Sequence, residues 1–202
     1  MLLVGTPNPP TVAFFAAAVG PSGKVTVIEP DAASLSRIED RLREENHQHV
    51  TLICKAASDH SGCEEFLVAE RTADSRLACD EVLHYNDLRG YRATCTVEVD
   101  QVDSIMQEVG VTRLDHVEVS VNGMEMHVLR GMQRILHNTS RAFVIGRGRC
   151  ADTGEPLNVP IARFLEDHGF RTHIVRDARC LSREGWGEVD GDVLAFRRRY
   201  RC

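Results

Sequence analysis

The sequence lacks the features of a membrane protein or a secreted precursor. Near its N-terminus, the apolar stretch at residues 12–19 is far too short to cross a bilayer. Three prolines at positions 7, 9 and 10 interrupt the apolar region, and no Lys or Arg precedes it, so it does not resemble a signal peptide. We therefore expect no membrane partner, and we interpret this region as the start of the fold.

An excess of basic residues is also missing. The chain has 24 Lys and Arg against 30 Asp and Glu, which gives a formal net charge of −6. Binding to nucleic acid normally needs a basic surface, so we expect no nucleic-acid partner. The basic run at residues 197–201 is a local exception, and we interpret it as a solvated segment.

The seven cysteines form no C-x-x-C pair, and both their odd number and their irregular spacing argue against a disulfide framework or a zinc site. The closest pair of histidines, His47 and His49, has no supporting Cys or carboxylate pattern nearby. We therefore predict no metal, reduced thiols and a cytoplasmic location.

What the sequence does contain is an alternation of strand and helix patterns. Short apolar, β-rich runs are followed by stretches with apolar residues at helical spacing, and Asp31 is placed to cap one of these helices. The pattern predicts strands at residues 2–5, 25–28, 50–54, 114–120, 141–146, 171–175 and 193–197, and helices at 11–19, 31–42, 100–109, 125–137 and 159–168.

Repeated β-α-β units at this spacing imply a parallel sheet with right-handed crossovers. We predict an α/β fold, with a Rossmann-like, doubly wound, mainly parallel seven-stranded sheet in a single domain over residues 1–202. Residues 63–99 interrupt the alternation, with strands at 63–68 and 94–99 around a polar segment. We expect them to form an excursion over the carboxyl edge of the sheet, where such folds bind their ligands. The sequence does not indicate an oligomeric state.

Glu29 is the first candidate site residue. It follows an apolar strand and lies 24 positions after Gly5. In doubly wound folds, an acidic residue at the end of the second strand accepts hydrogen bonds from a ribose diol. The alternative is a carboxylate that only caps the next helix, together with Asp31.

The first turn, residues 5–10, gives a weaker indication of nucleotide binding. A turn that binds a nucleotide normally has several glycines, so that its backbone can approach the ligand closely. Here only Gly5 remains, and the prolines remove backbone donors. Pro10 suits the first turn of a helix, whereas Pro9 is no obvious substitute for glycine.

Four segments together resemble the FkbM-type methyltransferases. They are residues 19–31 (VGPSGKVTVIEPD), 56–62 (AASDHSG), 99–102 (VDQV) and 122–131 (NGMEMHVLRG). The resemblance spans nearly the whole chain, and it is the combination of segments that makes it specific. It implies the class I methyltransferase type of the doubly wound sheet.

The resemblance also implies a function. Such enzymes use S-adenosylmethionine as cofactor and usually methylate a hydroxyl on a sugar, polyketide or other small molecule, so the expected partner is a small-molecule hydroxyl acceptor. Transferred to this chain, the cofactor-binding residues are Gly5, Glu29, Ser58 and Asp59, with Ser58 and Asp59 beside the adenine.

Several positions depart from the family pattern. The family usually has Asp where this chain has Leu3, and Gly where it has Pro9. It usually reads KIDVEG where residues 118–123 read EVSVNG. Residues that match the pattern are Gly5, Glu29, Ser58, Asp59, Asp100, Gly123 and Glu125.

The altered segment also supplies the candidates for catalysis, which are Glu118, Ser120, Asn122 and Glu125. Ser120 and Asn122 have no pKa that suits a general base near neutral pH. Glu118, Glu125, Asp100 or His127 are the alternatives for that role, although Glu118 can equally be a structural residue with an ion partner. His127 can likewise be a solvent-facing or hydrogen-bonded histidine.

Two other functions stay open. The altered motifs are compatible with a degenerate, non-catalytic copy of the fold that serves as a binding or partner module. Assignment as an NAD-dependent oxidoreductase would rest on analogy of fold alone, because the sequence has no G-x-G-x-x-G motif.

Overall fold

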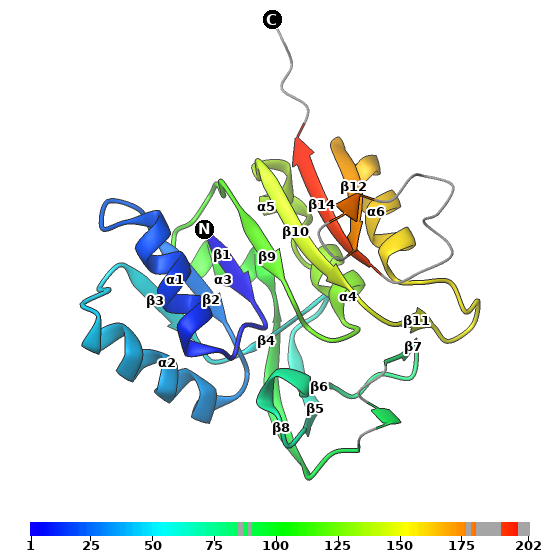
Figure 1. Ribbon diagram of the computed structural model, residues 1–202, viewed down its shortest axis with the longest axis horizontal. Helices are drawn as coiled ribbons and strands as arrows, with labels where there is room; N and C mark the ends of the chain where they lie inside the picture. The colour runs from blue at the N-terminus through cyan, green and yellow to red at the C-terminus, as the bar shows by residue number, and fades with distance from the viewer. Residues whose placement is uncertain (85–86, 89, 177–178, 181–190, 198–202) are drawn as a thin grey trace, which may run out of the picture.

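An eight-stranded sheet forms the centre of the molecule (Figure 1). The computed structural model describes residues 1–84, 87–88, 90–176, 179–180 and 191–197. Five neighbouring strands run parallel, and β14 is antiparallel to the strands on both of its sides. In spatial order the strands are β13 (Arg179–Cys180), β12 (Phe170–Arg176), β14 (Gly191–Arg197), β10 (Arg141–Gly146), β9 (Val117–Val119), β1 (Leu2–Val4), β2 (Val25–Ile28) and β3 (Val50–Ile53).

The predicted fold class is confirmed, because the sheet is mainly parallel and its order reverses beside β1. The predicted number of seven strands is wrong by one. The additional strand, β13, has two residues and pairs antiparallel with β12 at the edge of the sheet. A strand this short has no periodic pattern from which the sequence could predict it.

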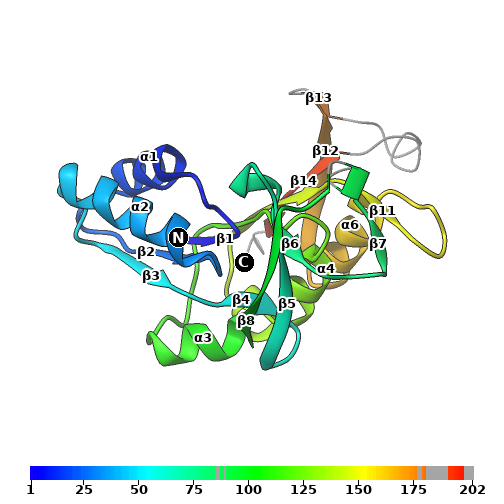
Figure 2. The same ribbon diagram turned by 90° about the horizontal axis from the view of Figure 1, so that it is seen from below.

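Helices cover the two faces of the sheet. α1 (Pro9–Val19) and α2 (Ala32–Glu44) lie on one face, over β1, β2 and β3, whereas α3 (Val102–Glu108) lies on the other (Figure 2). That second face also packs against α4 (Glu125–Arg130), α5 (Gln133–His137) and α6 (Asn158–Asp167) in one large apolar core. None of the described helices is long and apolar enough to cross a membrane.

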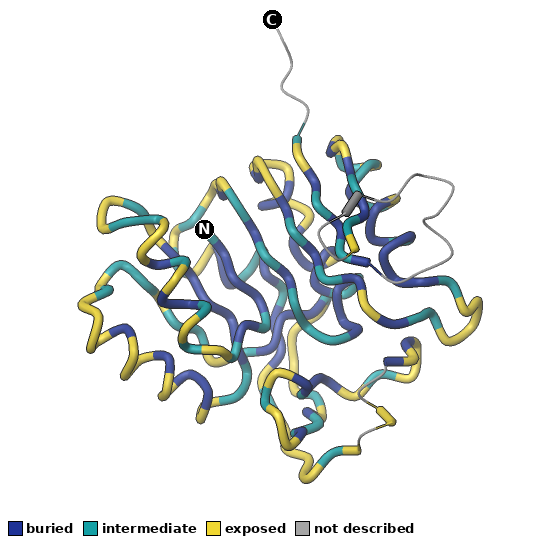
Figure 3. Tube along the Cα trace, in the orientation of Figure 1, coloured by how far each residue is buried: buried dark blue, intermediate teal, exposed yellow. Residues whose placement is uncertain are grey.

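The burial of the strands follows this arrangement. β1 and β2 are buried on both faces, whereas β10, β12 and β14 alternate between buried residues and more exposed ones (Figure 3). The prolines at the start of α1 and the carboxylate of Asp31 at the start of α2 occupy the positions that the sequence predicts. Asp31 accepts a hydrogen bond from the backbone of Ala33, so it caps α2 as expected.

The single helix predicted at residues 125–137 is wrong, because the chain forms α4 and α5 with a break after Arg130. The carboxylate of Asp103 accepts hydrogen bonds from the backbone of Arg134 and Ile135, each over 2.8 Å. This contact caps a new helix start, and it comes from a distant part of the chain. The spacing of apolar residues in this segment does not indicate the break between α4 and α5.

The predicted excursion forms a second sheet of four strands together with β4 (Ala56–Ser58), which precedes it in the chain. The strands are, in order, β4, β8 (Ala93–Gln101), β5 (Gly62–Val68) and β6 (Arg76–Leu77), with a 3-10 helix, η1 (Thr72–Asp74), before β6. A further pair of short strands joins β7 (Val82–Leu83) to β11 (Arg149–Cys150). The excursion thus extends from the edge of the central sheet to the loop that follows β10.

Candidate functional site

A cavity lies at the carboxyl ends of β1, β2 and β9, which is the edge where the sequence predicts ligand binding. Gly5, Glu29 and Ser120 line it from the side of the central sheet, and the excursion covers it from the opposite side. Its free volume is only about 40 Å³. The lining residues are Val4, Gly5, Pro7, Ile28, Glu29, Pro30, Ala56, Ala57, Phe66, Thr72, Ala73, Ser75, Arg76, Leu77, Ser120, Val121, Asn122 and Met124.

Glu29 directly follows β2 and is 4% exposed. Its Oε1 accepts a hydrogen bond from the backbone of Asp31 over 3.0 Å. Burial raises the pKa of the Glu29 carboxyl from 4.5 to about 7, and the nearby charge of Asp31 acts in the same direction. A buried carboxylate at this position is suited to accept hydrogen bonds from a bound diol.

The backbone conformation and the close packing at position 5 require glycine. Its φ is +72°, and a Cβ on it would lie 2.3 Å from the carbonyl oxygen of Ser120. Its N–H donates to the carbonyl of Ile28 over 2.9 Å, so Gly5 and Glu29 lie side by side at the ends of adjacent parallel strands. This placement of the two residues is the one predicted from sequence.

Asn122 connects the sheet to the excursion. It has a left-handed backbone with φ of 54°. Its Nδ2 donates to the carbonyl of Ala73 over 2.7 Å and to that of Ser75 over 3.0 Å. The side chain that replaces the family's carboxylate therefore holds η1 and the residue after it over the cavity.

Glu125 lies behind this segment and is buried at 1% exposure. Its Oε2 accepts a hydrogen bond from the backbone of Gly123 over 2.9 Å, whereas Oε1 has no partner among the described residues. Burial raises the pKa of this carboxyl to about 7. Glu125 does not line the cavity, and it contacts the backbone of Gly123, which lies between the lining residues Asn122 and Met124.

Comparison with known proteins identifies the fold and the family. The family description of the methyltransferase FkbM domain matches residues 4–172. The chain belongs to the FkbM methyltransferase family. No curated protein sequence matches it.

Solved structures agree with this assignment at the level of the fold. The FkbM methyltransferase of Methylobacillus flagellatus KT superimposes with a TM-score of 0.57 at 13% identity, over 96% of this chain and 43% of that protein. Fibrillarin of Aeropyrum pernix, in complex with S-adenosyl-L-methionine, superimposes with a TM-score of 0.54 at 14% identity, over 96% of this chain and 64% of that protein. A methyltransferase of Geobacter sulfurreducens superimposes with a TM-score of 0.50 at 14% identity, over 97% of this chain and 69% of that protein. The chain thus spans less than half the length of the Methylobacillus protein.

Ser58 and Asp59 do not line the cavity of this FkbM-family chain. Asp59 contacts His60 over 3.0 Å and lies 3.9 Å from the guanidinium of Arg130 on α4. Ala56 and Ala57, from the same strand as Ser58, line the cavity instead. The adenine contact of Ser58 and Asp59 stays a prediction.

Glu118 also lies outside the cavity, in the middle of β9. It is half-buried, and both this burial and the charge of Asp192 raise the pKa of its carboxyl. Strand alternation places it on the opposite face of the sheet from Val117 and Val119, which belong to the core beneath α3 to α6. The structure therefore brings Ser120 and Asn122 to the cavity and leaves Glu118 apart from them.

Sequence reasoning missed a second cavity on the other side of Gly123. Its volume is about 510 Å³, and His127, Glu81 and Arg130 are among its lining residues. The Nε2 of His127 lies 3.6 Å from Glu81 Oε2, while its buried Nδ1 has no partner among the described residues. Glu81 belongs to the irregular part of the excursion, so no spacing in the sequence indicates this pair.

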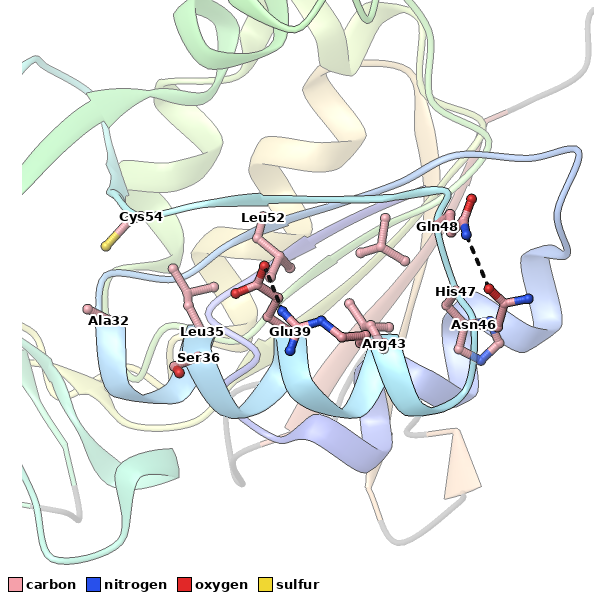
Figure 4. Close-up of a pocket in the computed structure, with 12 residues that line it drawn as sticks. Ala32, Leu35, Ser36, Glu39, Arg43, Asn46, His47, Gln48, Leu52 and Cys54 are labelled. Atoms are coloured by element: carbon pink, nitrogen blue, oxygen red, sulfur yellow. Dashed lines mark hydrogen bonds and ion pairs between the residues drawn. The ribbon is translucent and has the colours of Figure 1, made fainter.

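A groove of about 700 Å³ lies elsewhere, between α2 and β3 (Figure 4). Four of its polar side chains are exposed and contact one another in pairs. Arg43 pairs with Glu39 over 3.4 Å, and Gln48 donates to Asn46 over 3.2 Å. It is an open surface groove, and none of the polar side chains among its described lining residues is buried.

Proposed function

We propose that the chain is an S-adenosylmethionine-dependent methyltransferase that acts on a hydroxyl of a small molecule or sugar. Membership of the FkbM methyltransferase family supports the reaction class. The observation that carries the proposal is the buried carboxylate of Glu29, beside the Gly5 turn at the carboxyl edge of the sheet. This is the position from which doubly wound folds bind a ribose.

The chemical character of the cavity fits the cofactor. Glu29 supplies an acceptor for the ribose hydroxyls, and Ala56, Ala57 and Phe66 supply an apolar surface for a base. When bound, S-adenosylmethionine supplies an electrophilic methyl group on a sulfonium. Such a transfer depends mainly on the alignment of the two reactants, which is what a rigid strand edge provides.

The cavity must open before a cofactor can enter. Its free volume of about 40 Å³ is enough for little more than water, whereas small-molecule sites usually enclose roughly 300–1,000 Å³. Thr72 to Ser75 cover it, held by the two hydrogen bonds from Asn122. Binding therefore requires this short segment to move away, and its return would exclude water from the site.

The acceptor side of the site is the 510 Å³ cavity that contains His127. Gly123 and the start of α4 separate it from the cofactor cavity, so an acceptor bound there is adjacent to the reacting edge. His127 is the residue we assign as proton acceptor for the hydroxyl, with the Glu81 carboxylate orienting its ring. The neutral side chains of Ser120 and Asn122 then need not act as bases.

A non-catalytic binding or partner module is the second candidate. The closed cavity favours it, because a chain whose excursion never opens would retain the fold without a usable cofactor site. The two functions differ in one measurable property, which is the binding of the cofactor by the isolated protein.

Isothermal titration calorimetry with S-adenosylmethionine, S-adenosylhomocysteine and NAD distinguishes these functions. We expect the first two ligands to bind and NAD not to bind. Glu29→Gln should weaken binding by about 1–3 kcal/mol, the range for a lost hydrogen bond to a charged group. Glu39→Gln, which changes an exposed carboxylate on α2, is the matched control. Absence of binding by the folded wild-type protein would favour the partner module.

A further inference from the structure

Half of the central sheet has helices on only one of its two faces. On the side of α1 and α2, the apolar cluster has members in β1, β2 and β3 and none in the described parts of β9, β10, β14 and β12. Figure 1 likewise shows α1 and α2 over one half of the sheet and no described helix over β10 and β14 on that side. Strands that pair in parallel in an α/β sheet, as β9 and β10 do, are normally covered on both faces.

Strand pairing identifies the side chains on the uncovered side. Leu3, in the apolar cluster beneath α1 and α2, is in register with Glu118, and Glu118 is in register with Phe143. The same row continues through Leu194 to His173. Directly opposed residues of paired strands share a face, and so do residues two positions apart on one strand. The four strands therefore present what we call the open face, which consists of Glu118, Phe143, Leu194 and His173 together with Arg141, Ile145, Asp192, Phe196, Arg171 and Val175.

The centre of the open face is apolar. Phe143, Ile145, Leu194 and Val175 are only partly buried, and Phe196 is 39% exposed. None of these five residues belongs to the three apolar clusters of the described core. A sheet surface that faces water normally alternates to polar side chains, whereas this one alternates to apolar ones. A contiguous apolar surface of this kind is typical of a protein–protein interface.

Charged side chains flank this apolar centre on opposite sides. Glu118 is on β9 and Arg171 is on β12, with β10 and β14 between them. Three strand spacings of about 4.8 Å separate the two side chains by roughly 14 Å, so they cannot pair within one molecule. Neither forms an ion pair with any other residue that the structure describes, and the nearest charge named for Glu118 is the negative one of Asp192. The open face thus has an acid and a base that each need a partner from outside.

The order of the strands determines how a second copy fits on this face. α1 and α2 lie next to β9, at one side of the open face. A two-fold axis parallel to the strands, between β10 and β14, places the partner's α1 and α2 at the other side, next to β12. An axis across the strands would instead bring the helices of both copies to the same place. Only the first arrangement lets the two faces approach to the roughly 10 Å of packed sheets.

We propose that the open face is a homodimer interface, in which two copies of this chain pack sheet against sheet about an axis parallel to the strands. β10 then lies against the partner's β14, so Phe143 faces the partner's Leu194. β9 lies against the partner's β12, so Glu118 faces the partner's Arg171. The two-fold symmetry forms each contact twice. Charge pairs beside an apolar centre fix the register of such an interface, and a single face that supplies both members of the pair is matched to its own copy.

Sedimentation velocity of the purified chain at about 1–100 μM tests the dimer, because dimers of moderate affinity associate in this range. We expect the wild-type protein to dimerise. Glu118→Arg and Arg171→Glu each place like charges opposite one another, so each should raise the dimer dissociation constant at least about tenfold. The double variant Glu118→Arg/Arg171→Glu exchanges the two charges and should restore the dimer. Arg171 is exposed, so Arg171→Glu should fold and tests the contact by itself.

Leu83→Glu is the matched control, since Leu83 is a 61% exposed apolar residue on β7, outside the open face. It should leave the dissociation constant unchanged, and circular dichroism should show that every variant is folded. A wild-type protein that stays monomeric at about 100 μM would overturn the proposal and leave the open face to a different chain. A dimer that persists in folded Arg171→Glu would place the interface elsewhere and overturn it as well. Failure of the folded double variant to restore the dimer would contradict the proposed axis.

Discussion

The side chain of Asn122 donates to the backbone carbonyl of Ala73 over 2.7 Å, and this contact joins the end of β9 to the segment that covers the cofactor cavity. The two residues are 49 positions apart in the sequence. A second hydrogen bond, to Ser75, strengthens the same connection. Asn122 therefore stabilises the closed form of the site, and its removal should favour the open form.

Asn122→Gly tests this connection. Glycine tolerates the left-handed backbone at this position, so the change removes the two hydrogen bonds without adding strain. Each bond contributes about 0.5–1.5 kcal/mol, so amide hydrogen exchange at Thr72 to Ser75 should accelerate several-fold or more. Asn46→Gly, at φ of 58° on the opposite side of the fold, is the matched control. Unchanged exchange in Asn122→Gly would show that other contacts hold the segment closed.

The raised pKa of Glu29 predicts that cofactor binding depends on pH. Only the ionised carboxylate accepts hydrogen bonds from both hydroxyls of a diol, and burial raises its pKa to about 7. Affinity for S-adenosylhomocysteine should therefore increase as the pH rises from 6 to 8, by up to about tenfold. Calorimetry across this range measures the effect, and Glu29→Gln should abolish it. A flat profile for the wild-type protein would mean that Glu29 does not contact the ligand through its ionised form.

The periodic parts of the fold were predictable from sequence. The β-α-β spacing placed Gly5 and Glu29 at one edge of a parallel sheet, because a strand, a helix and a second strand of these lengths can connect in few ways. Proline at the start of α1 and the Asp31 cap on α2 are equally local signals. Each of these predictions depends on residues that are close together in the chain.

The remaining parts of the site depend on contacts between distant segments. Arg76 and Glu81 reach the carboxyl edge only because the excursion folds back over it, and no periodicity in that polar segment indicates the path. Asp103 divides the predicted helix from a position about 30 residues away. Asn122 looks like a lost carboxylate in the sequence, whereas the structure shows a side chain that closes the cavity.

Glu125 predicts a pH dependence of stability. The folded protein holds this proton up to about pH 7, whereas the unfolded chain releases it near 4.5, so the unfolded state binds fewer protons between these values. The free energy of unfolding should therefore decrease as the pH rises from about 4.5 to 7. Glu125→Gln keeps an oxygen for the Gly123 N–H and removes the titration, so it should be more stable than wild type at pH 8, by on the order of 1–3 kcal/mol.

Urea unfolding at pH 5.5 and pH 8 measures this difference. The wild-type protein should lose more stability between the two values than Glu125→Gln does. Glu29 titrates in the same range and remains in both proteins, so the variant should keep a shallower slope. Equal losses in the two proteins would show that Glu125 does not hold its proton at neutral pH.

Gly5 and Gly110 provide a matched pair for the last prediction. Their backbones have nearly the same left-handed φ, +72° and +68°, so alanine costs each of them about 1–2 kcal/mol in backbone strain. A Cβ on Gly110 meets nothing within 4 Å, whereas one on Gly5 would overlap the carbonyl of Ser120 at 2.3 Å. Gly5→Ala must therefore push β9 and its following loop away from β1, at a further cost of about 1–3 kcal/mol in the free energy of unfolding.

Denaturant unfolding should show this additional loss of stability in Gly5→Ala. Calorimetry with S-adenosylhomocysteine should show weaker binding only in that variant, since the displaced segment includes Ser120 and Asn122. Equal destabilisation of the two variants would mean that the turn relaxes at no cost and that its close approach to Ser120 does not shape the site.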